Sequence, residues 1–440
     1  MARIRHVIVG GGTAGVNAIT TIRQYDRGAS EIILVAAERP YSRMVLPYYL
    51  KGTISESHVY TATPTRLRAL DVQAYIGQRA TRLDTSANVV TLDDGTELPY
   101  DDLLIATGSS AVRPPVSGAD SQDIHSFWTL EQAQGVVQQI RAGCHVVMVG
   151  AGFIAFTILN SILAQGARLT VVEIAPQILP RMIDPAGATL VEQWLQDHGV
   201  TVRTNAQLTA IEDAQGQKRL RFKGADDMLA DLVIMATGIR TNLEWLNGSG
   251  VEINRGIRVD EHLRSNVPNV YAAGDVAEGR DLITGESAIH AIEPTAMEHG
   301  RVVGANMAGQ PLTYRGSLLM NIVEVQGLEI ASFGSWDDTT AEVFSALKPE
   351  RPAYRKLLWH DDRITGAMIL GRAEDIWTTN DVGMLKGLVQ SGIRLSDWKP
   401  YLRHHLFEIK RAYIAAGTTA RLLPQTVQGR PSVPAAAITA

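Results

Sequence analysis

The sequence is almost without cysteine, and this scarcity excludes several kinds of site. One cysteine in 440 residues cannot form an intramolecular disulfide, a Cys-x-x-Cys redox pair, a cysteine-rich zinc site or an iron–sulfur cluster, which takes four cysteines. We therefore expect no metal site in this chain. Because disulfides are rare in reducing compartments, we also expect a cytoplasmic protein. The one thiol, Cys144, is expected to be a buried apolar residue.

A surplus of positive charge and a long membrane-spanning segment are also missing. The 41 Lys and Arg residues are outnumbered by 46 Asp and Glu residues, which disfavours a nucleic-acid-binding protein, because such proteins need a basic face. Residues 146–167 carry no charge and are long enough to span a bilayer, but glycines and polar residues interrupt them. A strand, a turn and a helix explain this stretch better, so we expect no membrane span.

The rest of the composition is that of a folded protein with several domains. Hydrophobic residues make up 45% of the chain and charged residues 20%, so the chain can build full-sized cores. This length corresponds to two or three domains. Glycine is abundant, at 39 residues, which directs attention to glycine-rich turns.

The N-terminal residues contain the pattern of a nucleotide-binding unit. An apolar run at residues 4–9 predicts a buried parallel strand, and the turn Gly-Gly-Gly-Thr-Ala-Gly follows at residues 10–15. Residues 16–22 continue as a helix, and residues 31–37 form the next predicted strand. Glu38 then stands at the place where a carboxylate accepts hydrogen bonds from the ribose of an adenosine.

Each glycine of this turn has a physical purpose. Gly10 permits the tight turn, Gly12 lets the backbone approach a pyrophosphate, and Gly15 lets the helix and the strand pack closely. The helix N-terminus offers free N–H groups to the phosphates. The glycines alone are a weak signal, and the flanking strand, helix and acid identify the motif.

The same construction occurs a second time. A strand at residues 146–149 leads into the turn Gly-Ala-Gly-Phe-Ile-Ala at residues 150–155, and a helix follows. A further strand at residues 168–172 ends next to Glu173. A carboxylate there accepts a bond from a ribose 2′-hydroxyl but repels a 2′-phosphate, so this half is predicted to prefer NAD over NADP. Two dinucleotide sites in one chain indicate a flavin and a nicotinamide, because hydride passes readily between them.

Three further strand ends complete an ordered set of motifs. Ala-Thr-Gly ends an apolar strand at residues 106–108 and again at residues 236–238, and Tyr-Ala-Ala-Gly-Asp stands at residues 271–275. With these, residues 3–310 resemble the FAD-dependent pyridine nucleotide oxidoreductases of the glutathione reductase superfamily. The resemblance implies an α/β fold with two Rossmann-like dinucleotide-binding domains. In that fold the FAD-binding domain is discontinuous and the NAD-binding domain is inserted into it.

The resemblance also implies a division of the chain, completed by a C-terminal α+β interface domain like that of the rubredoxin reductase and nitrite reductase large-subunit branch. The expected segments are the first part of the FAD-binding domain at 1–115, the NAD-binding domain at 116–240, the second part of the FAD-binding domain at 241–310, the interface domain at 311–415, and an extended tail at 416–440. Within the interface domain, the patterns predict strand pairs in 321–333 and 355–369, and helices over 375–392 and 396–413.

Coenzyme-binding roles follow from the resemblance residue by residue. The positions that hold the adenosine and pyrophosphate of FAD are matched by Gly10, Gly12, Gly15 and Glu38. The ribityl position is matched by Asp275, and the NAD-side positions by Gly150, Gly152 and Glu173. The other candidates for contacting a coenzyme are Thr13, Ala14, Arg39, Arg43, Pro47, Ala80, Thr107, Gly108, Arg113, Phe153, Ile154, Ala155, Gly238, Gly274, Glu293, Pro294 and Thr295. No residue is assigned as a catalytic acid or base.

Residues 39–50 resemble the loop beside the flavin in NADH:rubredoxin reductases, nitrite reductase large subunits and NADH oxidases. Thiol-using relatives carry a redox cysteine where this chain has Met44, and a thioether forms neither a thiolate nor a disulfide. Thr157 stands where many relatives have a glutamate beside the nicotinamide, which leaves the fine placement of the nicotinamide open.

A predicted helix begins near Pro294, a favourable position for proline. In the family the N-terminus of this helix points at one edge of the flavin and stabilises negative charge there through its dipole. Glu293 and His290 precede it closely. Two interpretations stay open: these side chains tune the flavin potential, or they are ordinary loop residues near a coenzyme.

The resemblance implies hydride transfer between NAD(H) and bound FAD. Because this chain has no redox thiol in that loop and no cluster-binding cysteines, we expect an iron–sulfur protein or subunit to exchange electrons with the flavin. A closer resemblance is to FAD subunits of multisubunit enzymes such as phenylglyoxylate dehydrogenase and tungsten aldehyde oxidoreductase, although spacing does not distinguish these from a free-standing rubredoxin or ferredoxin reductase. Two alternatives remain, an NADH oxidase or peroxidase and a non-catalytic FAD-bearing assembly subunit.

Overall fold

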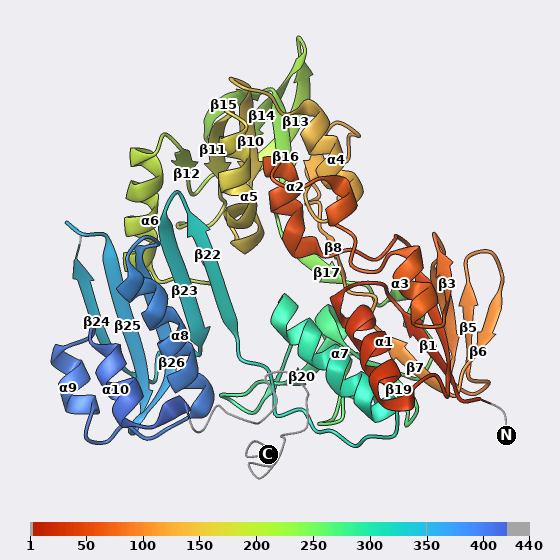
Figure 1. Cartoon of the computed structure of the whole chain (residues 1–440). Coiled ribbons are helices and arrows are strands. Elements are labelled where there is room, and N and C mark those ends of the chain that lie inside the picture. The colour runs from red at the N-terminus through yellow and green to blue at the C-terminus, as the bar shows by residue number, and fades with distance from the viewer. Residues whose placement is uncertain (1–2, 349, 420–440) are drawn as a thin grey trace.

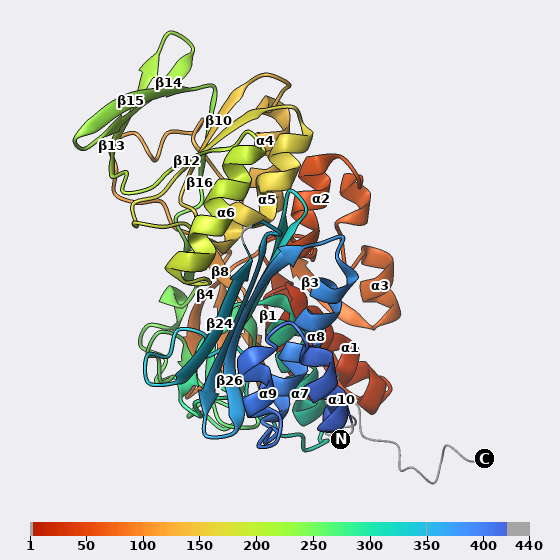
Figure 2. The ribbon, with the colours of Figure 1, turned by 90° about the vertical axis from the view of Figure 1, so that its left-hand side faces the viewer.

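A computed structural model of the chain describes residues 3–348 and 350–419 (Figure 1). Two parallel sheets and one antiparallel sheet organise these residues, each with its own covering helices (Figures 1 and 2). Most of the predicted tail at 416–440 lies outside the described residues. Within them, no helix is both long and apolar enough to cross a membrane. The uncharged stretch at 146–167 divides into a strand, a turn and a helix, as predicted.

The first sheet is parallel, with strand order β19-β7-β1-β2-β3. Its strands are β1 (Arg5–Val9), β2 (Glu31–Ala36), β3 (Val72–Ile76), β7 (Asp102–Ile105) and β19 (Val270–Ala272). The central strands are buried apolar runs, which is typical of a parallel sheet covered on both faces. The other helices and strands that belong to the same parts of the chain are α1 (Thr13–Asp26), α2 (Leu46–Lys51), α3 (Pro64–Ala69), β4 (Ala80–Asp84), β5 (Val89–Leu92), β6 (Glu97–Pro99), β18 (Ile257–Arg258), β20 (Ala277–Arg280), β21 (Ser287–Ala288) and α7 (Glu293–Met307).

Helices α1 and α7 lie side by side on one face of the first sheet (Figure 1). Two glycines of α7 allow this approach. A Cβ added to Gly300 would lie 2.3 Å from the carbonyl oxygen of Ala14, and one added to Gly304 would lie 2.6 Å from that of Ala18. The close contact fixes the N-terminal ends of both helices near the carboxyl end of β1, where the first glycine-rich turn lies.

The second sheet repeats the plan of the first, with strand order β12-β11-β10-β16-β9. Its strands are β9 (His125–Ser126), β10 (His145–Val149), β11 (Arg168–Val172), β12 (Thr201–Arg203) and β16 (Leu232–Met235). Its helices are α4 (Leu130–Gln139), α5 (Phe153–Ala164) and α6 (Pro185–Asp197), and a projecting antiparallel sheet is formed by β13 (Leu208–Ala214), β14 (Gln217–Phe222) and β15 (Ala225–Ala230).

Strand β19 follows the whole second sheet in sequence and yet pairs with β7 of the first sheet. The expected architecture of a discontinuous first domain with the second inserted into it is therefore confirmed, while the exact boundaries stay a prediction. The chain crosses between the two domains on one antiparallel pair, β8 (Ser109–Ala111) with β17 (Ile239–Thr241). Both crossings come directly after an Ala-Thr-Gly sequence.

The C-terminal residues form an antiparallel sheet with strand order β22-β23-β26-β25-β24. Its elements are β22 (Met320–Val325), β23 (Leu328–Gly334), β24 (Glu342–Lys348), β25 (Ala353–His360), β26 (Arg363–Arg372), α8 (Ile376–Ser391), α9 (Lys399–His404) and α10 (Ile409–Ala415). The predicted strand pairs and the helix over 375–392 are confirmed. The single helix expected over 396–413 is wrong, because the chain breaks between α9 and α10. The break turns the chain so that Leu406, Ile409 and Ala412 are buried in the same core as α8.

One hydrophobic cluster joins all three parts of the molecule. It takes Leu46 and Leu50 from α2, Phe156 from α5, and Val325 and Tyr354 from the C-terminal sheet. Burial of these side chains fixes the three parts against one another, at roughly 1.5–3 kcal/mol for each large apolar side chain. The cavity described next lies beside this junction.

Candidate functional site

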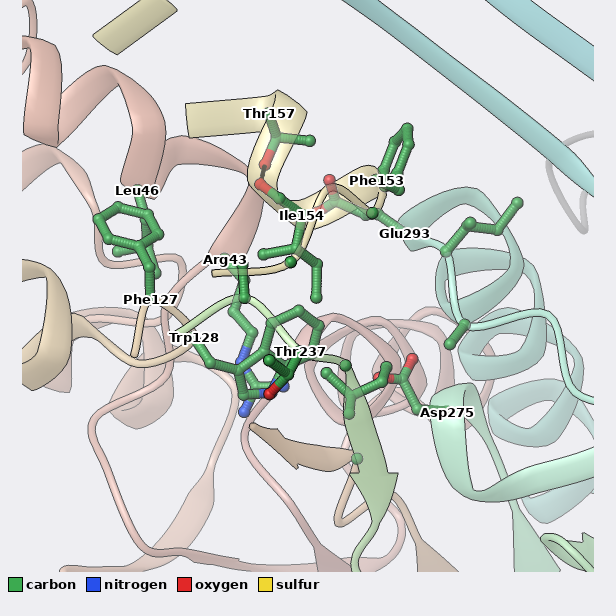
Figure 3. A pocket seen from close by; sticks show the side chains of 18 of the residues that line it. Arg43, Leu46, Phe127, Trp128, Phe153, Ile154, Thr157, Thr237, Asp275 and Glu293 are labelled. Atoms are coloured by element: carbon green, nitrogen blue, oxygen red, sulfur yellow. Dashed lines mark hydrogen bonds between the residues drawn. The ribbon is translucent and has the colours of Figure 1, made fainter. Parts of the chain in front are cut away.

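A cavity of about 1380 Å³ lies where the three parts of the molecule meet. Its walls are the two glycine-rich turns, the segment between β2 and α2, the N-terminal ends of α5 and α7, and the beginning of β22. Figure 3 shows side chains around it from several of these elements, among them Arg43, Phe153 and Glu293. Pockets for single drug-sized ligands measure roughly 300–1,000 Å³, so this cavity has room for more than one such ligand.

The first glycine-rich turn has a closed side and an open side. Gly10 has a φ of +121°, and a Cβ there would lie 2.0 Å from the carbonyl oxygen of Ala106. A Cβ on Gly15 would lie 2.0 Å from the carbonyl oxygen of Gly10. An added Cβ at Gly12 meets nothing within 4 Å, although Gly12 lines the cavity. The turn therefore keeps free space over Gly12, next to the unpaired amides of the first turn of α1.

The second glycine-rich turn repeats this division. A Cβ on Gly150, whose φ is +102°, would lie 2.4 Å from the carbonyl oxygen of Ala236, whereas one on Gly152 meets nothing within 4 Å. Glu173 lines the cavity and is only 9% exposed. Its carboxylate accepts hydrogen bonds from the backbone N–H groups of Ala151 (2.7 Å) and Ala175 (2.9 Å). Glu173 thus ties the turn to the end of β11 and presents a fixed negative charge at the cavity wall.

Asp275 is held at the cavity wall through Ser109. The hydroxyl of the buried Ser109 donates to Oδ2 of Asp275 at 2.5 Å. The carbonyl of Ser109 accepts from the indole N–H of Trp128 (2.6 Å) and from the guanidinium of Arg43 (3.3 Å). Figure 3 shows Arg43 and Trp128 next to each other. Ser109 therefore joins Arg43 and Trp128 through its carbonyl to Asp275 through its hydroxyl, and Oδ1 of Asp275 takes no bond within this network.

The start of α7 carries a third acidic group at the wall, Glu293. Oε1 of Glu293 accepts from the hydroxyls of Thr13 and Ser42, at 3.1 Å each. These bonds join the N-terminal ends of α1 and α7 to the segment before α2. A helix N-terminus stabilises negative charge, so the beginning of α7 is suited to an anionic group in the cavity.

His290 does not line the cavity. Its Nε2 lies 3.2 Å from Oδ2 of Asp281. Burial opposes ionisation of Asp281, but the hydrogen bond from His290 and those from backbone N–H groups outweigh it and lower the pKa of this carboxyl. The structure therefore places His290 against Asp281 and outside the cavity lining, and only Glu293 of the two candidates lines the cavity.

The carboxylate of Glu38, which lines the cavity, affects the ionisation of the neighbouring Tyr41. Burial raises the pKa of Tyr41, and its hydrogen bond to the Glu38 carboxylate raises it further, to about 12. The phenol oxygen also accepts from the backbone N–H of Leu130 at 3.0 Å. The phenol of Tyr41 is thus held at the backbone of Leu130, and both Tyr41 and Glu38 line the cavity.

Met44 and Cys144 bear on thiol chemistry at the cavity, and Thr157 bears on the placement of a nicotinamide. Met44 lines the cavity and is 49% exposed. Cys144 is buried in the hydrophobic core and does not line the cavity, as expected for a small apolar residue. Thr157 lines the cavity, but its hydroxyl donates to the carbonyl of Ile154 on its own helix at 2.7 Å.

Most of the predicted coenzyme-binding residues line this one cavity. They are Gly10, Gly12, Thr13, Ala14, Glu38, Arg39, Arg43, Pro47, Thr107, Gly108, Gly150, Gly152, Phe153, Ile154, Glu173, Gly238, Gly274, Asp275, Glu293 and Pro294. The exceptions are Gly15, Ala80, Arg113, Ala155 and Thr295. Gly15 serves helix packing, and Ala155 and Thr295 are buried within their helices. The guanidinium of Arg113 donates to backbone carbonyls of Ala119, Ser121 and Ile124 and so braces a loop.

Several lining residues were not predicted from the sequence. They include Tyr41, Phe127, Trp128, Arg181, Gln207 and Asn321. Trp128 stands in a connection between two motifs, where no periodicity or spacing singles it out. Asn321 belongs to the C-terminal sheet, which the motif set does not cover. Only Tyr41 had a signal, because it belongs to the loop of residues 39–50.

Comparisons with known proteins identify the family and the fold of the chain. A family model described as "Pyridine nucleotide-disulphide oxidoreductase" matches residues 4–300. The chain is 32% identical over 335 residues to the NADH-dependent phenylglyoxylate dehydrogenase subunit epsilon of Aromatoleum evansii, covering 75% of this chain and 79% of that protein. It is 29% identical over 309 residues to the rubredoxin-NAD(+) reductase of Pseudomonas putida, covering 69% and 80%. Among solved structures, a NAD-dependent persulfide reductase from A. fulgidus is 27% identical, with a TM-score of 0.82 over 90% of this chain and 78% of that chain.

Proposed function

The chain belongs to the pyridine nucleotide-disulphide oxidoreductase family, and from that premise we propose that it exchanges electrons between NAD(H) and an iron–sulfur protein or subunit. It is an FAD-dependent NAD(H) oxidoreductase, and the finer proposal concerns its partner. One observation carries the proposal: a single cavity of about 1380 Å³ is lined by both glycine-rich turns and by no cysteine side chain of the described residues.

The residues at the two turns fit two dinucleotides. Gly12 and Gly152 each leave open the space that a Cβ would fill, as a pyrophosphate lying against the backbone requires. We assign FAD to the turn at Gly12, with Glu38 at the adenosine ribose and Asp275 at the ribityl chain. We assign NAD(H) to the turn at Gly152, with Glu173 at the ribose.

When both coenzymes are bound, a hydride passes between the nicotinamide and the flavin. This step needs no side-chain acid or base, so the work of the chain is to orient its ligands and to shape their electrostatics. The N-terminus of α7 would stabilise negative charge on a flavin held beside it. The network of Arg43, Trp128 and Ser109 fixes Asp275 in place.

We propose an external partner because no cysteine of the described residues lines the cavity to relay electrons from the flavin. Met44 occupies the cavity wall beside α2, and the buried Cys144 lies away from it. Electrons are therefore exchanged directly with an external carrier that accepts them singly, as iron–sulfur centres do. The names of two relatives support such a carrier, since one is a subunit of a larger dehydrogenase and the other acts on rubredoxin.

Anaerobic stopped-flow spectroscopy tests this proposal. NADH is expected to bleach the flavin band of the FAD-loaded protein, and the reduced protein is then expected to reduce rubredoxin or a ferredoxin faster than it reacts with dissolved oxygen. Absence of bleaching would refute the proposed function. Bleaching followed by faster oxidation with oxygen than with either carrier would favour the NADH oxidase alternative.

A further inference from the structure

The first turns of helix α5 form one wall of the cavity. Helix α5 lies between two further walls, one at α2 and the other at β22. Phe153, Ile154 and Thr157 line the cavity from α5. On one flank α5 lies against α2, and on the other against β22 (Figure 1). The positions of all three walls therefore depend on what fastens this helix on each side.

The flank toward α2 is fastened by two hydrogen bonds. The hydroxyl of Ser161 donates to the carbonyl of Pro47 at 2.7 Å, and the side-chain amide of Gln165 donates to the carbonyl of Leu50 at 2.9 Å. Pro47 itself lines the cavity. These bonds fix α5 relative to the first domain.

The flank toward the C-terminal sheet is fastened by one side chain, Asn160. Its Nδ2 donates to the carbonyl of Glu324 at 2.9 Å and to Oε2 of the Glu324 carboxylate at 3.1 Å. Its Oδ1 accepts from the backbone N–H and from the side-chain amide of Gln326, at 2.9 Å each. One amide thus makes four hydrogen bonds to the turn between β22 and β23.

The turn to which Asn160 is hydrogen-bonded is tight and has an uncommon backbone conformation. Gln326 has a φ of 48° and Gly327 a φ of 82°, so a residue with a side chain occupies the left-handed region, which costs free energy outside glycine. The indole N–H of Trp194 on α6 also donates to the carbonyls of Val325 and Gln326, at 3.2 Å each. The second domain therefore holds this turn from two helices.

Strand β22 is hydrogen-bonded to Asn160 near its end and lines the cavity at its beginning. Met320, Asn321 and Ile322 of β22 line the cavity together with the first turns of α5. Strand β22 is short, so a shift at Glu324 moves Ile322 with it. Asn160 lies two helical turns after Phe153, on the side of α5 that faces β22.

We propose that Asn160 is a positioning residue for hydride transfer, because it fixes the separation between α5 and β22 on the nicotinamide side of the cavity. The inference rests on the proposed function, since the nicotinamide is the group placed there. Asn160 does not line the cavity and acts through the two walls. A wall displaced by a fraction of an ångström changes the approach of nicotinamide to flavin, and small misplacements reduce reaction rates steeply.

The test compares three variants of the FAD-loaded full chain with the wild type. Asn160→Ala removes all four bonds. In the double variant Asn160→Asp, Glu324→Gln, the side-chain amide at 324 donates to the carboxylate at 160, so this one bond returns with donor and acceptor exchanged. The bond from residue 160 to the backbone carbonyl of residue 324 stays lost. Gln193→Ala is the matched control, because the Gln193 amide bonds only to Asp197 on its own helix among the described residues.

Two measurements are made on each variant. Single-turnover reduction by NADH is expected to be about tenfold slower in Asn160→Ala, with the dissociation constant of NADH changed less than about twofold. Amide hydrogen exchange of residues 320–328 in the coenzyme-free protein is expected to be faster. The double variant is expected to recover both properties toward the wild type, and the control to alter neither.

The outcomes separate this inference from the proposed function. Wild-type reduction rates in Asn160→Ala would overturn the positioning role, even if the protein were less stable. Slow reduction in both Asn160→Ala and Gln193→Ala would equally overturn it, because the slower reduction would then not result from loss of the Asn160 hydrogen bonds. The proposed function fails instead if NADH does not reduce the wild-type flavin at all.

Discussion

The guanidinium of Arg43 lies over the indole ring of Trp128, with 4.8 Å between Cζ and the ring centroid. Both side chains also donate to the carbonyl of Ser109. The indole therefore supports Arg43 in two ways, through its ring face and through a shared acceptor. Because Arg43 lines the cavity in the first domain, to which we assign FAD, we expect this pair to affect the binding of FAD rather than of NAD(H).

The first prediction is that Trp128→Ala weakens FAD binding about tenfold and Trp128→Phe about threefold. A cation–π contact contributes about 0.5–1 kcal/mol and a hydrogen bond about 1 kcal/mol, and phenylalanine keeps only the ring. Fluorescence titration of the FAD-free protein measures the dissociation constant. Trp377→Ala, on an exposed face of α8, serves as the control. Equal FAD affinity in Trp128→Ala and the wild type would contradict the support of Arg43 by the indole.

The second prediction tests the two dinucleotide sites independently, by adding one methyl group to the glycine-rich turn of each site. Gly12→Ala is expected to fold normally and to lose FAD, whereas Gly152→Ala keeps FAD and loses affinity for NADH. In both cases the added Cβ meets no protein atom within 4 Å, so it intrudes only on the space of a pyrophosphate. Flavin absorbance after desalting and isothermal titration with NADH give the two readouts.

Gly15→Ala provides the contrast for this pair. Its Cβ would lie 2.0 Å from the carbonyl oxygen of Gly10, so this variant is expected to be unstable whether or not a coenzyme is present. If Gly12→Ala were to lose its thermal transition as Gly15→Ala does, the open space over Gly12 would not be a binding site.

The sequence was sufficient for the parts of the site that local geometry dictates. Gly10, Gly12 and Glu38 belong to one continuous unit of strand, turn, helix and strand, so their spacing alone places them together. The same holds for Gly150, Gly152 and Glu173. The strand pairs of the C-terminal sheet were predictable for the same reason, since alternation along a strand is a local property.

Contacts between distant segments were not predictable in this way. Trp128 reaches Ser109 and Arg43 only because three loops converge, and no short window of sequence contains that relationship. Asn160 is one polar residue on an apolar helix, and its partners lie more than 160 residues away. The break between α9 and α10 also depends on tertiary burial, because the local pattern favours a single helix.

The third prediction concerns the choice of nicotinamide coenzyme. Glu173→Arg is expected to lower the ratio of kcat/KM for NADH to that for NADPH about hundredfold, since it replaces like-charge repulsion of a 2′-phosphate by attraction. Activity with both coenzymes should also fall, because the bonds to Ala151 and Ala175 are lost. Glu212→Arg, on the projecting sheet of the same domain, controls for charge reversal. An unchanged ratio would show that Glu173 does not lie at the ribose.

The fourth prediction concerns the pH dependence of stability and rests on His299 in α7. Burial lowers the pKa of His299, and the neighbouring His290 lowers it further, to about 3. Nδ1 of His299 accepts from the backbone N–H of Gly274 at 3.3 Å, next to Asp275, and the ring stands edge-on to Tyr314 with 4.6 Å between centroids. The neutral ring is thus part of the support beneath the cavity.

A histidine whose pKa is depressed on folding is protonated more readily in the unfolded chain. Stability is therefore complete above the unfolded pKa of about 6.5 and declines as pH falls below it, until the folded state is protonated near pH 3. For His299 the loss between pH 8 and pH 5 amounts to about 2 kcal/mol of unfolding free energy. Urea unfolding followed by tryptophan fluorescence at these two pH values measures it. In His299→Asn the amide oxygen can replace Nδ1 as acceptor without titrating, so this part of the pH dependence should disappear, while replacement of the exposed His58 by Asn leaves it intact. If His299→Asn were to keep the full pH dependence, the titrating group would lie elsewhere in the chain.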